Sequence, residues 1–533
     1  MKRNKALFYR TVIAAGLSMV ALFASRRVFA AGDSNLVVKT RQGKVEGIMS
    51  GPRTPQVRAF LGIPYAAPPI GPLRWKEPMP ATKWSGVRAA KVFGLHCMQP
   101  TLYADMIFRD PGQSEDCLTL NVWTPATSKG AKLPVMVWIY GGGFQTGGTS
   151  EARQDGANLA TRGVVVVSMN YRLGIFGFFA HPDLAAESGR NSAGNYGLLD
   201  QTAALRWVQA NVKNFGGDPH NVTLFGESAG SASVSAQMAS PLAKGLFQRT
   251  IGESGGEFAG SRARSTLLKD EETEHALFAQ TVLSVSTLEQ LRALPAEQLL
   301  GASRRTAPGG EEFRFNPIVD GYFLPESPAA IFAAGRQNDV PMLAGWNRDE
   351  GGIAPQTTMA SFAADVERQF GDRAPDVLKL YSATSDEEAV RAAADLAGDR
   401  FIAYSTWRWI EAQSTTGHQP IYWYRFDLAP PPDPNHTGGL TAYHSAEIPY
   451  VFGNLDLLNG FDWRPEDRQL SDQMQRYWTN FARKGDPNGE GLPQWPVYKA
   501  DSTWIVMHLG AQPAAAPDAN RQRDLLLSSI WGR

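Results

Sequence analysis

The sequence predicts an α/β protein built on a mostly parallel sheet with helices on both faces. Apolar runs rich in β-branched residues occur at 135–140 and 164–169 without alternation, which is typical of strands buried on both faces. Shorter runs of the same kind occur at 222–225 and 341–344. Helical patterns such as residues 198–212 lie between them, and this alternation of strands and helices favours a doubly wound sheet.

The composition is that of a globular protein. Of 533 residues, 43% are hydrophobic and 20% are charged, which excludes a disordered, collagen-like or coiled-coil chain. Lys and Arg together number 52, as do Asp and Glu. Because six basic and no acidic residues lie within 1–30, the chain from residue 31 has a net charge of −6. This charge argues against nucleic acid or an anionic membrane as a partner.

Residues 1–30 have the pattern of an export signal peptide. A basic start is followed by an apolar run at 11–23 and then by small residues, with Ala30 offering a cleavage site. The apolar run is too short to span a bilayer, which needs about 20 apolar residues. Arg26 and Arg27 stand between the run and that site, so cleavage nearer Ala24 or an uncleaved anchor stays open. We therefore expect an exported protein, periplasmic or secreted, with no later membrane span.

Residues 31–533 are predicted to form a single domain. Alternating apolar residues at 36–48 predict a small hairpin at its front. Helical patterns at 255–339 and 357–417 predict two helical insertions on the rim of the sheet. A further helix is predicted at 467–484, where the glycine and proline that follow end it.

The chain has two cysteines, Cys97 and Cys117. In an exported protein such a pair predicts a disulfide that closes a surface loop, since a metal site would need more ligands. Two reduced, buried thiols are the alternative.

The sharpest local motif is Gly-Glu-Ser-Ala-Gly at 226–230, directly after the predicted strand at 222–225. G-x-S-x-G between a strand and a helix is the context of a nucleophile elbow, in which the serine occupies a tight turn. Ser228 is therefore a candidate nucleophile, and side chains at Gly226 and Gly230 are expected to collide with the neighbouring backbone. The alternative is a glycine-rich helix start with a capping serine.

A serine nucleophile needs a histidine to take its proton and a carboxylate to orient that histidine. In folds with this elbow the acid and then the histidine follow the serine along the chain. Three later histidines lie in a predicted surface helix or near predicted strands and turns, without a polar motif: His275, His418 and His508. The pattern prefers His444, which begins His-Ser-Ala-Glu-Ile-Pro-Tyr, only modestly to His436.

The acid is less determined than the histidine. Residues 346–352 follow the predicted strand at 341–344, and sheets of this kind place their working residues at the carboxyl ends of strands. Asp349 or Glu350 therefore qualifies, although either is equally compatible with a solvated turn.

Acyl transfer also needs N–H donors directed at the developing oxyanion. The segment 140–144, Tyr-Gly-Gly-Gly-Phe, follows the strand at 135–140 and offers three glycines whose N–H groups can turn into a cavity. Ala229, the residue after the candidate nucleophile, offers another. A glycine triplet can also hold a phosphate, but no Gly-Lys-Ser/Thr follows it, so a nucleotide site is not expected.

With these motifs the sequence resembles the type-B carboxylesterase family, the cholinesterase-like branch of the α/β-hydrolases. The resemblance covers almost all of 31–533 and runs through these motifs: 60–75, 114–121, 140–144, 170–172, 194–200, 215–219 and 226–230. Among bacterial members the chain is similar to p-nitrobenzyl esterase-like and fumonisin esterase-like enzymes, the latter on residues 447–452.

The resemblance implies an α/β-hydrolase fold, helical insertions around an active-site gorge, and hydrolysis of small-molecule carboxylic esters through an acyl-enzyme. No metal or organic cofactor is expected. The implied site residues are the triad Ser228, Glu350 and His444, the oxyanion donors Gly142, Gly143 and Ala229, and a disulfide between Cys97 and Cys117. Supporting roles are suggested for Glu227, Ser254 and Glu447.

The same resemblance narrows the substrate and leaves alternatives. Cholinesterases carry a tryptophan in the disulfide loop that holds a quaternary ammonium by cation–π attraction. Residues 98–116 contain Tyr103 and Phe108 but no tryptophan, which disfavours choline esters. A catalytically silent adhesion or binding protein, which the family also contains, and a lipase or amidase are the alternative functions.

Overall fold

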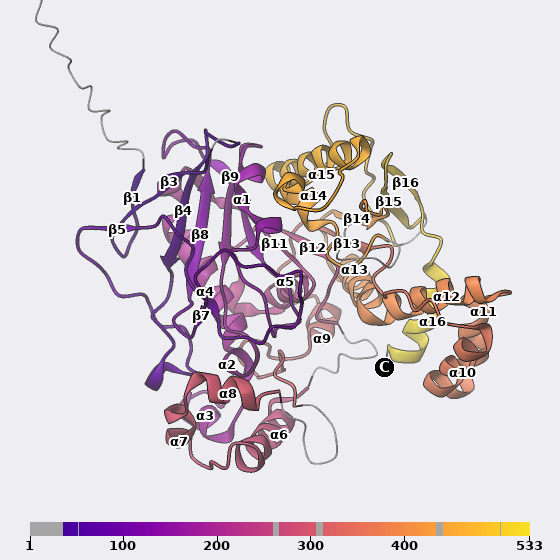
Figure 1. Ribbon diagram of the computed structural model, residues 1–533, viewed down its shortest axis with the longest axis horizontal. Helices are drawn as coiled ribbons and strands as arrows, with labels where there is room; N and C mark the ends of the chain where they lie inside the picture. The colour runs from indigo at the N-terminus through magenta and orange to yellow at the C-terminus, as the bar shows by residue number, and fades with distance from the viewer. Residues whose placement is uncertain are drawn as a thin grey trace, which may run out of the picture. The chain divides into compact units, whose positions relative to one another are not determined.

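The computed structural model describes residues 36–51, 53–258, 266–304, 313–432, 441–500 and 503–532. Its main feature is an 11-stranded sheet (Figure 1). In sheet order the strands are β16 (Ala514–Pro517), β15 (Ile505–Leu509), β14 (Ile421–Phe426), β13 (Met342–Asn347), β12 (Arg249–Glu253), β11 (Gly217–Glu227), β9 (Leu133–Ile139), β10 (Val165–Met169), β8 (Thr119–Thr124), β4 (Arg58–Pro64) and β3 (Ile48–Met49).

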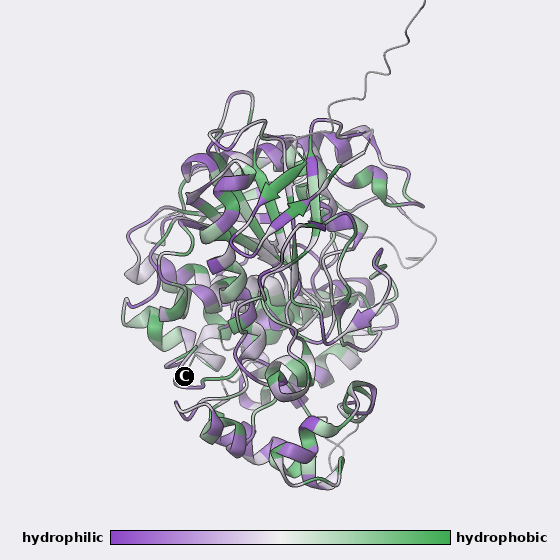
Figure 2. Cartoon of the chain, turned by 90° about the vertical axis from the view of Figure 1, so that its left-hand side faces the viewer, coloured by the Kyte–Doolittle hydropathy of each residue, from purple (hydrophilic) through white to green (hydrophobic). Residues whose placement is uncertain are grey.

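The centre of this sheet is parallel and its edges are antiparallel. All neighbours from β15 through to β10 pair in parallel, whereas β16 on one edge and β8, β4 and β3 on the other pair antiparallel. The apolar runs predicted as buried strands are β9 and β10, whose residues are almost all fully buried. Figure 2 shows strands coloured as hydrophobic in the interior of the fold. The predicted α/β fold with a mostly parallel sheet is confirmed.

Helices flank the sheet, and the described parts of both segments that were predicted to be helical contain several of them. Before β13 they are α1 (Gly156–Ala160), α2 (Gly174–Phe178), α3 (Pro182–Glu187), α4 (Tyr196–Asn211), α5 (Ala229–Ala239), α6 (Leu268–Thr281), α7 (Leu288–Ala293), α8 (Ala296–Ala302) and α9 (Pro328–Ala333). After β13 they are α10 (Met359–Phe370), α11 (Ala374–Leu380), α12 (Asp386–Gly398), α13 (Tyr404–Thr416), α14 (Ile448–Phe452), α15 (Pro465–Lys484) and α16 (Arg521–Trp531). In the described parts of the chain, no helix combines the length and the apolar character that crossing a membrane requires.

Helices α10, α11 and α12 share a small hydrophobic core of their own (Figure 1). Phe362 of α10, Val377 of α11 and Ala389 of α12 are buried in it, and side chains of α16 pack against it. Between α12 and α13 the chain continues as a π-helical segment, η6 (Asp399–Ala403). Segments of this type are rare and occur frequently at functional sites.

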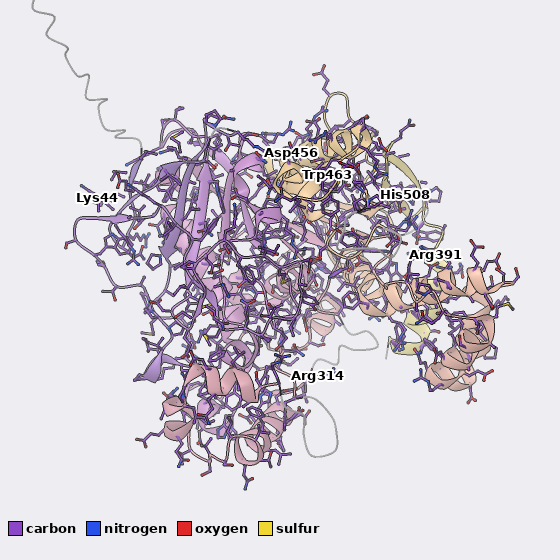
Figure 3. All side chains as sticks on the ribbon, in the orientation of Figure 1. Lys44, Arg314, Arg391, Asp456, Trp463 and His508 are labelled. Atoms are coloured by element: carbon purple, nitrogen blue, oxygen red, sulfur yellow. A yellow bond between two sulfur atoms is a disulfide. The ribbon has the colours of Figure 1, made fainter. Side chains whose placement is uncertain are left out.

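The front of the chain forms two small sheets. Strands β1 (Val37–Lys39) and β2 (Lys44–Glu46) pair antiparallel, which confirms the predicted hairpin, and β5 (Val87–Ala89) joins β2 in parallel. Figure 3 labels Lys44, the first residue of β2. Strand β6 (His96–Cys97) pairs with β7 (Gln113–Ser114).

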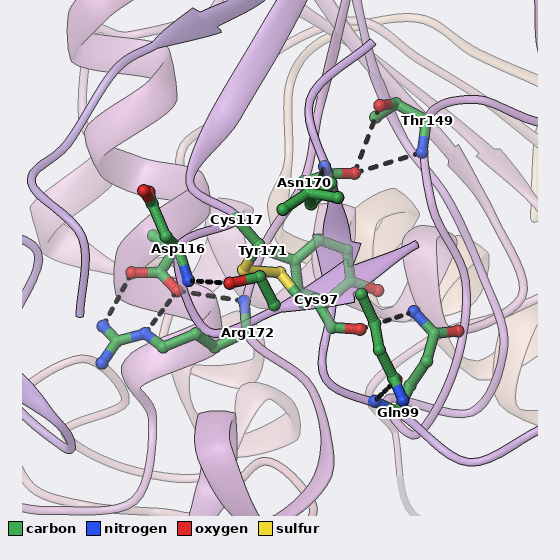
Figure 4. Close-up of a disulfide and its surroundings, with 12 residues drawn as sticks. Cys97, Gln99, Asp116, Cys117, Thr149, Asn170, Tyr171 and Arg172 are labelled. Carbon is green, nitrogen blue, oxygen red and sulfur yellow. Dashed lines mark hydrogen bonds and ion pairs between the residues drawn. A yellow bond between two sulfur atoms is a disulfide. The ribbon is translucent and has the colours of Figure 1, made fainter. Parts of the chain in front are cut away.

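A disulfide joins Cys97 and Cys117, with their Cα atoms 5.0 Å apart (Figure 4). The two cysteines are 20 residues apart, and closing a loop of this length stabilises a fold by about 3 kcal/mol in the loop-entropy description. The Asn170 amide ties the start of this loop to the sheet, because it donates to the Leu95 carbonyl at 3.0 Å and accepts from the Thr149 N–H at 3.1 Å. The disulfide loop is thereby fixed beside the end of β10.

Two of the histidines set aside in the sequence analysis have surroundings that the sequence pattern did not show. His275 was expected on a surface helix, but it is fully buried and stacks against Phe179 and Phe315, with ring centroids 5.3 and 4.7 Å away. His508 has no polar motif beside it in the sequence, but its Nδ1 lies 2.6 Å from Asp427 Oδ2 because β15 pairs with β14. His508 is labelled in Figure 3. Helix α6 does lie at the surface as expected, since Leu277 is 46% exposed, and His275 lies on its buried face.

Candidate active site

Ser228 lies on the turn between β11 and α5. Its backbone has φ 56° and ψ −122°, a conformation that residues other than glycine rarely adopt. A Cβ on Gly230 would lie 2.0 Å from the Ile139 carbonyl oxygen, and one on Gly226 would lie 2.6 Å from the same atom. Side chains at these two positions would therefore collide with the backbone, as expected. Because both residues are glycine, the turn can pack closely against β9.

The structure brings Ser228, His444 and Glu350 together from three distant parts of the chain. His444 Nε2 lies 2.9 Å from Ser228 Oγ, and His444 Nδ1 lies 2.6 Å from Glu350 Oε2. The other carboxylate oxygen, Glu350 Oε1, accepts the Asn347 N–H at 2.7 Å. The carboxylate is thereby held on the side of the imidazole opposite the serine. The alternative histidine, His436, lies outside the described residues.

The two candidate acids, Asp349 and Glu350, face different partners. Asp349 pairs with Arg348 at 2.8 Å and with Arg391 of α12, which is labelled in Figure 3. It also accepts the Ala442 N–H at 2.8 Å, while its own N–H donates to the Ala442 carbonyl at 3.0 Å. Asp349 therefore fastens the loop after β13 to the segment that carries the histidine.

Three of the residues that line the cavity beside Ser228 are the candidate oxyanion donors Gly142, Gly143 and Ala229. Within the described residues, none of the three donates to a protein acceptor. Gly142 and Gly143 have φ of 110° and 64°, and a Cβ on Gly142 would lie 2.1 Å from the Thr146 carbonyl oxygen. Only glycine fits at 142, so this conformation depends on the glycine triplet.

Two buried carboxylates lie next to this group. Glu227 Oε1 accepts the Ser445 hydroxyl at 2.6 Å and lies 3.2 Å from His444 Nε2. Glu447 Oε2 accepts the side-chain amide of Asn347, whose backbone N–H binds Glu350. Glu227 thus contacts His444 directly, whereas Glu447 is linked to Glu350 through Asn347.

Ser254 follows β12 and lies in the same buried region. Its N–H donates to the Gly345 carbonyl at 2.8 Å, and its φ is 54°. Its hydroxyl is buried, and no hydrogen-bond partner for it occurs within the described residues. The structure therefore gives Ser254 no contact with the imidazole or with the nucleophile hydroxyl.

Burial and the neighbouring charges shift the pKa of His444 in opposite directions but the pKa of Glu447 in the same direction. Burial raises the pKa of Glu227, and burial together with the charges of Glu227 and Glu350 raises the pKa of Glu447 to about 8. Burial alone would lower the pKa of His444, but the negative charges of Glu227 and Glu350 raise it to about 9. The imidazolium is therefore stabilised by the carboxylates around it.

Ser228, Glu227 and His444 line a cavity of about 1300 Å³. Its walls come from the disulfide loop, the glycine triplet, the segment after β12, α6, the segment before β13, η6 and the loop of His444. Its charged and titratable lining residues are Asp105, Glu151, Arg153, Glu227, Glu257, Glu271, Glu274, Arg314, Arg400, Tyr103, Tyr140, Tyr443 and His444. A cavity of this size accommodates a small organic substrate.

Sequence reasoning missed Phe401, which lies in η6 and covers the imidazole. Its ring contacts the His444 ring edge to face, with centroids 5.0 Å apart and an interplanar angle of 75°. Phe401 is 41% exposed and lines the cavity. Helical periodicity runs unbroken through this region, so nothing in the pattern indicated where the π-helical segment turns a side chain toward the histidine.

Sequence reasoning also missed Glu253, the last residue of β12. The carboxylate is fully buried and accepts the indole N–H of Trp478 at 2.7 Å, a contact between residues 225 positions apart. Burial and the charge of Glu447 raise its pKa well above the usual range. Such a long-range contact has no local sequence signal.

Comparison with known proteins shows to which family the chain belongs. Residues 34–525 match the family model described as the carboxylesterase family. The chain is 36% identical over 504 residues to fumonisin B1 esterase of Sphingopyxis macrogoltabida, covering 90% of this chain and 87% of that protein. It is 38% identical over 484 residues to para-nitrobenzyl esterase of Bacillus subtilis (87% and 93%), and 36% identical over 518 residues to carboxylesterase 5A of Canis lupus familiaris (89% and 86%).

The match spans nearly the whole described chain, and the relatives cover a similar length. The expected fold and the expected enzyme class, a carboxylic ester hydrolase, are therefore both confirmed. The protein belongs to the carboxylesterase family, whose fold is that of the α/β-hydrolases.

Proposed function

We propose that the chain hydrolyses small-molecule carboxylic esters with Ser228 as nucleophile, His444 as general base and Glu350 as the acid that orients it. One observation carries the proposal: the imidazole lies 2.9 Å from the serine hydroxyl and 2.6 Å from the carboxylate at the same time. This is the spacing that a nucleophile, its base and the orienting group require.

In the proposed reaction Ser228 Oγ attacks the ester carbonyl while its proton moves to His444 Nε2. The negative charge that develops on the carbonyl oxygen is stabilised by the N–H groups of Gly142, Gly143 and Ala229. His444 then returns the proton to the leaving alcohol, and an acyl-Ser228 ester remains. A water molecule deprotonated by His444 hydrolyses this ester and frees the acid.

Glu227, Glu447 and Ser254 are proposed to support this reaction without forming a bond to the substrate. Glu227 would stabilise the imidazolium from the serine side, since it lies 3.2 Å from His444 Nε2. Glu447 would act through Asn347, which positions Glu350. Ser254 would hold the backbone next to β13 through its bond to Gly345.

The acyl-enzyme predicts a burst in rapid-mixing experiments with p-nitrophenyl acetate. When deacylation is slower than acylation, one equivalent of p-nitrophenol per enzyme should be released before the steady rate begins. Release of only the slow, uncatalysed background would support the alternative of a catalytically silent binding protein. If replacing Ser228 by alanine left the steady-state rate unchanged, a residue other than Ser228 would be the nucleophile.

The rate should increase with pH across neutrality, because only the neutral imidazole of His444 can accept the proton. Since carboxylates raise its pKa to about 9, the midpoint of the kcat/KM profile should lie above the ordinary histidine value of about 6.5. Glu227→Gln removes one of these charges and should move the midpoint to lower pH. Glu274→Gln removes a charge from the cavity without acting on His444 and should leave it in place. An unchanged midpoint in Glu227→Gln would contradict the role of Glu227.

We also propose that residues 1–30 direct export and are removed, leaving residues 31–533 as one domain. The supporting observation is the disulfide, because such bonds persist in oxidising compartments. The mass of the protein recovered from the periplasm or medium tests this. A full-length chain found in the cytoplasm would contradict it.

A further inference from the structure

Glu257 lies on the short segment that leads from β12 past the nucleophile. Two residues before it, Gly255 lies so close to the elbow that a Cβ there would be 2.3 Å from the Ser228 carbonyl oxygen. The Glu257 N–H donates to Ser235 Oγ of α5 at 2.7 Å. The next residue, Phe258, is buried against Phe332, with ring centroids 5.2 Å apart. The backbone is thus fixed on both sides, and the half-buried side chain lines the cavity.

The Glu257 carboxyl differs from other carboxyls of the same cavity in having no partner within the described residues. Glu151 binds the Gln154 amide at 2.6 Å and lies 3.2 Å from Arg153 Nε, and Glu227 binds Ser445. Burial raises the pKa of Glu257 to about 7, and no neighbouring charge contributes to this shift. A polar group removed from water without a hydrogen bond costs about 1–3 kcal/mol, and such groups in native structures commonly have a functional reason.

The basic residues of the cavity wall do not neutralise Glu257. Arg153 is occupied by Glu151 and by Asp105, which lies 3.1 Å away. The Arg400 guanidinium lies 5.9 Å from the centre of the Phe370 ring. Arg314, labelled in Figure 3, is exposed and contributes nothing to the pKa of Glu257. The carboxylate is therefore available to a cationic group of a bound substrate.

We propose, building on the esterase function above, that Glu257 is a specificity residue that selects esters carrying a protonated amine. A protonated tertiary amine supplies both an N–H donor and a positive charge, and it satisfies the unpartnered carboxylate by a charge-assisted hydrogen bond. An anionic substituent at the same place is repelled. A neutral alkyl group leaves the carboxyl without a partner.

The test compares esters that differ only in the charge of one end. On the alcohol side, 3-(dimethylamino)propyl benzoate is compared with 4-methylpentyl benzoate. On the acyl side, 1-naphthyl 6-(dimethylamino)hexanoate is compared with 1-naphthyl 7-methyloctanoate. In each pair a protonated nitrogen replaces a CH group of nearly the same size. The measured quantity is the ratio of kcat/KM for the charged ester to that for its neutral partner.

For the unmodified protein we expect this ratio to be about ten or more in at least one of the two series. Glu257→Gln keeps the shape of the side chain and should bring the ratio close to one, whereas Glu257→Asp keeps the charge and should retain part of the preference. Circular dichroism establishes that the variants are folded. A ratio near one in the unmodified protein for both series, or a ratio unchanged by Glu257→Gln, would overturn the proposal.

Active-site titration with diethyl p-nitrophenyl phosphate separates this inference from the function on which it rests. If the reagent labels the protein without substitutions but no preference for charged esters is measured, only the proposed role of Glu257 is contradicted. If the reagent does not modify the protein and the neutral esters are not hydrolysed, the proposed esterase mechanism itself fails.

Discussion

Ser228→Ala is expected to lower kcat by about 10⁶, because the variant keeps the imidazole and the carboxylate but has no atom that can form the acyl-enzyme. The variant should fold normally, since alanine is no larger than serine and the Ser228 hydroxyl contacts the cavity and His444 rather than the core. The measurement is the hydrolysis of p-nitrophenyl butyrate, with thermal unfolding of both proteins as a check on folding.

Ser231→Ala is the matched control for this variant. Ser231 lies three residues further along, in α5, and its hydroxyl donates to the Gly255 carbonyl at 2.6 Å. It touches no reacting atom, so kcat should remain within about tenfold. If Ser228→Ala retained an appreciable share of the activity, Ser228 would not be the nucleophile.

Glu350→Gln is expected to lower kcat by about 10⁴, by analogy with the loss of the orienting charge in serine proteases. The amide keeps the size of the side chain but removes the negative charge that holds the imidazole and stabilises its protonated form. Because substrate binding does not involve Glu350, the loss should appear in kcat more than in KM. Steady-state kinetics on p-nitrophenyl butyrate measures both.

Asp349→Asn provides the neighbouring control. Asp349 pairs with Arg348 and Arg391 and accepts the Ala442 N–H, so the variant should lower the unfolding temperature. Its kcat should stay within about tenfold of the unmodified value. If Asp349→Asn lost the activity while Glu350→Gln kept it, the two carboxylates would have to exchange roles.

The parts of the site that could be predicted from the sequence are those built by contacts between residues close together in the chain. The elbow at Ser228 is local: a strand, the serine and a helix follow one another directly, and that turn leaves no room for side chains at Gly226 and Gly230. The choice between Asp349 and Glu350 is not local. Adjacent residues of the loop face opposite ways, and the bond from Asp349 to Ala442 decides which of them reaches the histidine.

The histidines show the same limit. Nothing in the residues around His444 distinguished it strongly from His436, and its selection relied on the resemblance to a family. The burial of His275 was not foreseen because the periodicity of α6 does not reveal that Phe315, forty residues later, stacks on its ring. Phe401 and Glu257 were missed because their place in the cavity depends on a π-helical segment and on an elbow from another strand.

The most direct test of the central claim is the mass of the protein after reaction with diethyl p-nitrophenyl phosphate. We expect one diethylphosphoryl group per chain, located by peptide mapping on the peptide that contains Ser228, with activity lost in proportion to labelling. The Ser228→Ala variant should remain unlabelled. Full labelling of another residue, or full esterase activity in a protein labelled at Ser228, would contradict the account.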